Sequence, residues 1–151
     1  MELRRIIFFA VQAGTCWYAL RRGALPERSV AMMMAVAALA TVASPVRPHV
    51  SYYTVELPVL TIDLVFLGCL CILAVRADRF WPMWVAALQL LAIAVHGVRL
   101  YDSQLLPSVY SAAVGLMAYP MMALLVVGTH RHVRRVSLRG PEPDWSVLRW
   151  R

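Results

Sequence analysis

Apolar residues gather into five runs, separated by short segments that carry charged residues, proline or both. The runs cover residues 3–20, 29–44, 57–75, 80–100 and 108–128. About 20 apolar residues, rising 1.5 Å each in a helix, cross a hydrocarbon core of roughly 30 Å. The pattern therefore predicts an all-α fold: a polytopic bundle of transmembrane helices with five spans.

The first run allows a second interpretation. Arg4 and Arg5 stand at its start, as in a signal peptide, but the apolar stretch continues through Trp17 and Tyr18 instead of ending at a cleavage site. We expect an uncleaved span, and the alternative is a helix on the membrane surface, which leaves four spans. Residues 1–136 then form the transmembrane domain, and 137–151 form a cytoplasmic tail that is flexible or interfacial.

Composition supports a lipid environment. Hydrophobic residues make up 61% of the 151 residues. A water-soluble domain of this size could not bury so large an apolar fraction, because small domains have a high ratio of surface to volume. We expect the lipid bilayer to surround the chain.

The net charge of +7 comes from fifteen arginines, with no lysine. They stand at the borders of the apolar runs, so we expect membrane topology to explain them and expect no nucleic-acid binding. With five spans, one side holds most of the arginines that flank the helices: Arg21, Arg22, Arg28, Arg76, Arg79, Arg131, Arg134, Arg135 and Arg139. The positive-inside rule then predicts a bacterial inner-membrane protein with a cytoplasmic carboxyl terminus.

Asp63 lies within the third run and is the residue that most needs an explanation. A carboxylate in the middle of a span costs about 2.5–3.5 kcal/mol on insertion scales, so it should face protein. Gln89, His96 and Arg99 recur on one face of the fourth helix, and His96 and Arg99 lie at about the depth of Asp63. We predict an intramembrane polar site of these four residues, either a clasp between helices or a site that holds and exchanges a proton.

Other candidate chemistry is sparse. Arg131, Arg134 and Arg135 follow the fifth run and are candidates for contact with anionic lipid headgroups. No Cys/His spacing typical of a metal site is present, and we expect no cofactor. Haem ligation through His96 would need a second histidine at the same depth, which the fifth run does not offer, so it would require His49 or a second protomer.

Motifs of soluble enzymes are absent, and we expect no catalysis. The segment 76–84, Arg-Ala-Asp-Arg-Phe-Trp-Pro-Met-Trp, followed by His96, resembles a turn of small bacterial inner-membrane proteins of unassigned function. This resemblance implies the same location and carries over no functional residue.

Three functions remain open on the sequence. The first is a noncatalytic accessory or structural subunit that packs against a membrane-protein partner or a second copy of itself. The second is a small proton-coupled carrier or permeation unit that uses Asp63 and His96. The third is a holin-like pore former, suggested by the small size and the basic tail.

Overall fold

The computed structural model describes residues 2–44, 57–77, 79–101 and 107–140, apart from the side chains of residues 2, 99–101 and 107–114. Within this part the chain forms five helices and no strand. The helices are α1 (Glu2–Arg22), α2 (Leu25–Ala43), α3 (Leu57–Arg76), α4 (Trp81–Tyr101) and α5 (Pro107–Arg139). The predicted all-α class is confirmed.

Helix α2 begins at Leu25, earlier than the span start predicted at residue 29. Pro26 occupies its first turn, where a backbone N–H is not needed. Glu27 Oε2 accepts a hydrogen bond of 3.1 Å from the backbone N–H of Ala24, which occupies one of the unpaired donors at the helix start. Only Gly23 and Ala24 separate α1 from α2, so the two helices form a tight antiparallel hairpin.

Helix α5 continues beyond the span end predicted at residue 128. It reaches Arg139, so the basic stretch after the apolar run is helical. Gly140 ends the helix with a φ of 81°, the left-handed conformation that glycine adopts without a steric cost. The backbone N–H of Gly140 also bonds the carbonyl oxygen of Val136 at 3.0 Å.

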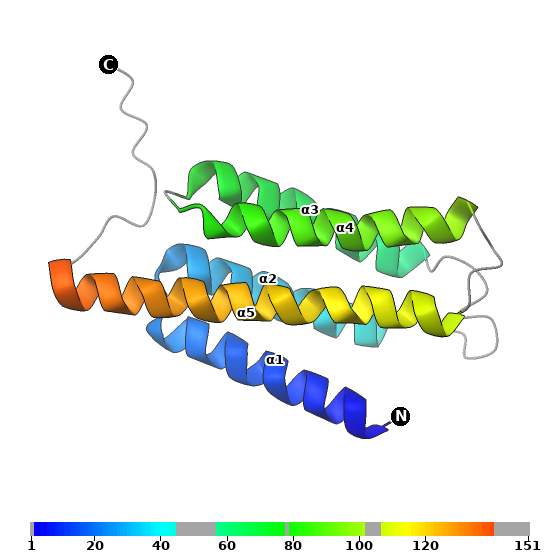
Figure 1. The fold of residues 1–151 in the computed structure, drawn as a ribbon, viewed down its shortest axis with the longest axis horizontal. Helices are drawn as coiled ribbons and strands as arrows, with labels where there is room; N and C mark the ends of the chain where they lie inside the picture. The colour runs from blue at the N-terminus through cyan, green and yellow to red at the C-terminus, as the bar shows by residue number, and fades with distance from the viewer. Residues whose placement is uncertain (1, 45–56, 78, 102–106, 141–151) are drawn as a thin grey trace, which may run out of the picture.

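The helices alternate in direction along one common axis (Figure 1). Helix α5 packs against α1, α2 and α4, and α3 packs against α2 and α4. Figure 1 shows α5 crossing the bundle and extending past it at one end. The central position of α5 allows its side chains to meet residues from three other helices.

One end of the bundle, here called the Arg-rich end, holds the α1–α2 hairpin, the α3–α4 connection and the end of α5 (Figure 1). It carries the arginines that the sequence placed on one side: Arg21, Arg22, Arg28, Arg76, Arg79, Arg131, Arg134, Arg135 and Arg139. Arg4 and Arg5 lie at the opposite end, here called the far end. The two ends of the folded bundle therefore differ in arginine content, which is the difference that the positive-inside rule uses.

Three of the helical segments are long and apolar enough to cross a membrane: Leu25–Ala43, Leu57–Arg76 and Trp81–Val98. The bundle has an apolar interior centred on Val30, Leu70, Val85 and Leu125. Large apolar side chains also cover its outside, including Leu39, Val65, Val75 and Phe80. An apolar exterior of this kind is compatible with a membrane protein.

Candidate functional site

Asp63 lies in the second turn of α3 and is held by two side chains of α4. Gln89 Nε2 donates a hydrogen bond of 3.0 Å to Asp63 Oδ1 and lies 3.3 Å from the Asp63 backbone oxygen. His96 Nε2 lies 3.1 Å from Asp63 Oδ2. The structure therefore brings three of the four predicted site residues together, and both carboxylate oxygens have a partner.

The spacing of Gln89 and His96 explains this geometry. They stand seven positions apart, close to two turns of α4, so they project from the same face. Val85 and Ala92 complete that face and are buried with them. Arg99 belongs to α4, but its side chain lies outside the described residues.

The cluster is sheltered but not closed. The exposed fractions of the side chains are 2% for His96 and 19% for Asp63. A carboxylate oxygen and an imidazole nitrogen at hydrogen-bond distance share one proton, donated either by the Nε2–H of His96 or by a protonated Asp63. The arrangement can therefore clasp two helices, or hold a proton near the far end.

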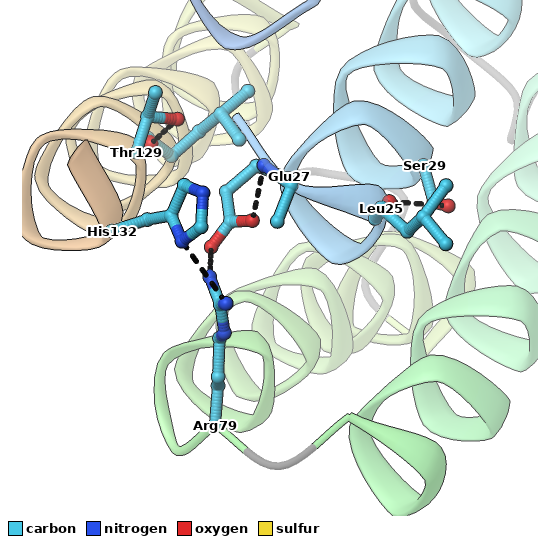
Figure 2. Close-up of polar contacts among 8 residues, drawn as sticks. Leu25, Glu27, Ser29, Arg79, Thr129 and His132 are labelled. Carbon is cyan, nitrogen blue, oxygen red and sulfur yellow. Dashed lines mark hydrogen bonds and ion pairs between the residues drawn. The ribbon is translucent and has the colours of Figure 1, made fainter. Parts of the chain in front are cut away.

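A second buried cluster, absent from the sequence-based prediction, lies at the Arg-rich end (Figure 2). Glu27 Oε1 forms an ion pair with Arg79 Nη1, and Arg79 Nη2 lies 3.1 Å from His132 Nδ1. Arginine has only donors, so His132 Nδ1 accepts and neutral His132 carries its proton on Nε2. The Glu27 and Arg79 side chains are only 0% and 6% exposed.

This cluster, here called the Glu27–Arg79–His132 lock, joins three segments that are distant in the sequence. Glu27 comes from the first turn of α2, Arg79 from the residues before α4, and His132 from the extension of α5. Figure 2 shows the Arg79 side chain reaching between the two other residues. The lock therefore fixes α2, α4 and α5 to one another at this end.

A local signal for part of the lock was present in the sequence. Proline followed by glutamate, Pro26-Glu27, is typical of the first turn of a helix, and it stands among arginines. From this signal, α2 is predicted to begin at residue 25, with an acidic residue in its first turn. It does not reveal the pairing with Arg79 or His132, because nothing in the local pattern encodes contacts across more than fifty positions.

A buried polar contact ties α1 to α2. Gln12 is buried, and its Nε2 donates a hydrogen bond of 3.1 Å to the backbone carbonyl of Met34. Among the described residues, Gln12 Oε1 has no hydrogen-bond partner. We have no physical account of this unsatisfied oxygen.

In the part of the chain that the structure describes, no three His, Cys, Asp or Glu side chains are placed to hold a metal ion. His96 contacts Asp63 near the far end, whereas His130 and His132 lie toward the Arg-rich end. Of the predicted lipid contacts, Arg131 and Arg134 are exposed and Arg135 is half-buried. Arg131 and Arg135 also line a pocket that Arg134 does not reach.

No family model, no curated protein and no solved structure matches this chain.

Proposed function

We propose that this chain is an integral protein of the bacterial inner membrane, with five spanning helices and the end of α5 in the cytoplasm. Three helices have the length and composition of spans. Helix α5 packs against two of them, α2 and α4, and α1 packs against α2 and α5, so all five share one bundle. The concentration of arginine at one end supports a cytoplasmic position for that end.

Within that membrane, we propose a noncatalytic accessory or structural role. The observation that carries this proposal is the double clasp on Asp63, in which each carboxylate oxygen is occupied by a side chain of α4. A carboxylate on one helix that is hydrogen-bonded by side chains of a second helix stabilises one arrangement of the two helices. The apolar outer surface then provides the area for a membrane-protein partner or a second copy, which chemical crosslinking in native membranes would identify.

The clasp predicts that substitutions of its residues are coupled. Gln89→Leu leaves a sheltered carboxylate without its Oδ1 partner, so we expect it to lower the free energy of unfolding by about 1–3 kcal/mol. Asp63→Leu removes the carboxylate but leaves the buried amide of Gln89 without its Oδ1 acceptor, so we expect a loss of similar size. Unfolding in mixed detergent micelles measures both. The double variant Asp63→Leu/Gln89→Leu should lose less than the sum of the two single losses, because it leaves neither partner of the bond unsatisfied, and a simple sum would argue against a clasp.

A second candidate function, proton-coupled transport, is favoured by the Asp63–His96 pair itself. The two groups lie 3.1 Å apart, and the Asp63 side chain retains 19% exposure. A carboxyl and an imidazole in contact are the groups that relay protons in membrane proteins.

Proton flux into liposomes separates the two functions. For an accessory protein we expect the wild type, Asp63→Asn and His96→Ala to give the same flux as protein-free liposomes. Flux in the wild type that both substitutions abolish, while the variants keep their helical content, would overturn the accessory role in favour of transport.

The proposed orientation has its own test. Green fluorescent protein fused after residue 151 should fluoresce, because it folds in the cytoplasm, and alkaline phosphatase at the same position should be inactive. Fusions ahead of α1 should behave in the opposite way if α1 spans the membrane. Active phosphatase at the carboxyl terminus would mean that the orientation is the reverse of the one proposed.

A further inference from the structure

Helix α5 continues past its apolar run, from residue 129 to Arg139, and this part is here called the α5 extension. Residues 129–139 include four arginines and two histidines but no acidic residue. Figure 1 shows the extension following the bundle axis and ending beyond the other helices. Within the described part of the chain, none of the other helices therefore covers its end.

One side of the α5 extension is exposed and basic. Its exposed side chains recur at helical spacing, so they lie on one side of the helix, here called the basic face: His130, Arg131, Arg134, Ser137 and Leu138. Arg135 is half-buried, lines the pocket between α4 and α5, and has an interaction partner. It is therefore not counted in the charge of the basic face.

The opposite side of the extension is held against the bundle. His132 accepts the hydrogen bond of 3.1 Å from Arg79 Nη2 as part of the Glu27–Arg79–His132 lock. Val133 and Val136 are half-buried on the same side of the helix as His132. The basic face is thus presented in a fixed orientation, so a partner that binds it has little of this chain left to order.

The two arginines of the basic face lie close to one another. Arg131 and Arg134 stand three positions apart, a spacing at which like charges repel on a helix surface. Among the described residues, neither forms an ion pair with an acid, and the described acid at this end, Glu27, is buried against Arg79. A partner that brings carboxylates to this face relieves the repulsion.

The depth of the basic face decides between lipid and a partner in water. Trp81 packs its ring on Gly128, and tryptophan is typical of the level where hydrocarbon meets headgroups. At 1.5 Å per residue, Arg134 lies about 9 Å and Leu138 about 15 Å beyond Gly128 along the helix. A headgroup layer is only about 5–7 Å thick, half the difference between the whole bilayer and its core. The outer half of the basic face therefore lies beyond the headgroups.

We propose that the basic face of the α5 extension docks an acidic segment of a protein partner in the cytoplasm. Arg134 binds carboxylates of the segment with paired hydrogen bonds, and Leu138, which is 73% exposed, packs against one of its apolar side chains. Leu138 favours a protein segment over RNA, because RNA has no aliphatic side chain to pack against it. The inference rests on the proposed membrane location, and it adds a partner distinct from the one that packs on the apolar outer surface.

A photocrosslinker at Ser137 tests the occupant in native membranes. The Ser137 side chain is exposed and its hydroxyl bonds the backbone carbonyl of Arg134 in its own helix, so Ser137→benzoylphenylalanine spares the contacts to other helices. We expect a crosslink to a protein peptide of net negative charge, and its loss at high salt. A crosslink to phospholipid, to RNA, to a second copy or to residues 141–151, or no crosslink at all, would each overturn the proposal.

A defined probe measures the contribution of the basic face directly. The full chain in phosphatidylcholine nanodiscs, whose lipid carries no net charge, is titrated with a fluorescent peptide of glutamate and leucine at helical spacing. Arg131→Gln/Arg134→Gln should weaken binding by about tenfold or more, because the loss of one charge-assisted hydrogen bond already corresponds to that factor. Leu138→Ser should weaken binding as well, although it leaves the charge unchanged.

The matched control is Arg21→Gln/Arg22→Gln, which removes the same charge from exposed positions at the same end of the bundle. It should change the affinity by less than about twofold, because salt screens charges that do not touch the peptide. Equal losses in the two double variants, or an unchanged affinity in Leu138→Ser, would mean that diffuse charge attracts the peptide and would overturn the docking site. A chain that does not enter nanodiscs contradicts the membrane proposal itself, whereas an inserted chain that binds no peptide contradicts only the docking site.

Discussion

Glu27→Gln is expected to lower the free energy of unfolding by about 3 kcal/mol, although it changes one atom of the side chain. The amide can still accept the hydrogen bond from Ala24, so the start of α2 keeps its cap. Arg79, however, is left as a buried cation without a carboxylate. Breaking a buried ion pair by removing one partner typically costs about 3–5 kcal/mol, because the remaining charge stays desolvated. Unfolding in mixed detergent micelles measures this loss.

Arg28→Gln is the matched control for this prediction. Arg28 is the next residue in the chain and is exposed, and its substitution also changes the charge by one. It should alter the stability by less than about 1 kcal/mol. In the cycle with Arg79→Met, the double variant should be more stable than the sum of the single losses predicts. Equal behaviour of Glu27→Gln and Arg28→Gln would mean that the lock contributes nothing to stability.

Gly23→Ala is expected to disrupt the α1–α2 hairpin. A β-carbon at this position would stand 2.5 Å from the carbonyl oxygen of Ala19 and 2.6 Å from the β-carbon of Glu27. Neither atom is the free end of a flexible side chain, so the backbone itself must move. Overpacking of this kind typically costs about 1–3 kcal/mol, and we expect the upper end of that range.

Gly68→Ala gives the opposite expectation in the same protein. A β-carbon on Gly68 of α3 meets nothing within 4 Å, so the substitution should be neutral or stabilising by up to about 1 kcal/mol. The same unfolding measurement compares the two variants. A Gly23→Ala protein as stable as Gly68→Ala would show that the hairpin adjusts without cost.

Gly23 and Glu27 lie in neighbouring parts of the Arg-rich end. The absence of a side chain at Gly23 lets both the Ala19 carbonyl oxygen and the Glu27 β-carbon approach the turn closely. Glu27 then reaches Arg79, which reaches His132 on α5. The tight turn and the lock together hold the Arg-rich end, and the pocket between α4 and α5 depends on the same positions of Arg79 and Trp81.

Much of the architecture followed from the sequence because it depends on local composition. The span predicted at 57–75 corresponds to α3, Leu57–Arg76, since a long apolar run bounded by charge has one low-energy form in lipid. The approach of Asp63 to α4 followed as well. An acid in a span must find a polar partner, and α4 offers a single polar face.

The helix boundaries predicted from the sequence are less accurate where a helix begins or ends with polar residues. The start of α2 was placed at residue 29 because Glu27 and Arg28 interrupt the apolar run, yet Pro26 and Glu27 form its first turn. The apolar run predicts an end of α5 at residue 128 because polar residues begin there, yet the helix continues to Arg139. Hydropathy reports where a helix enters lipid, whereas hydrogen bonding and glycine decide where it stops.

The sequence by itself determined that this chain forms five helices in alternation, with arginine gathered at one end and a carboxylate that must face protein. The tertiary structure alone decided that Glu27, Arg79 and His132 meet, and that Arg131 and Arg135 line a pocket while Arg134 does not. The reason is physical: periodicity and transfer energies act along a few turns of chain. Contacts between α2, α4 and α5 depend on how the helices pack, and here a glycine without a side chain and a helix extended past its apolar run set that packing.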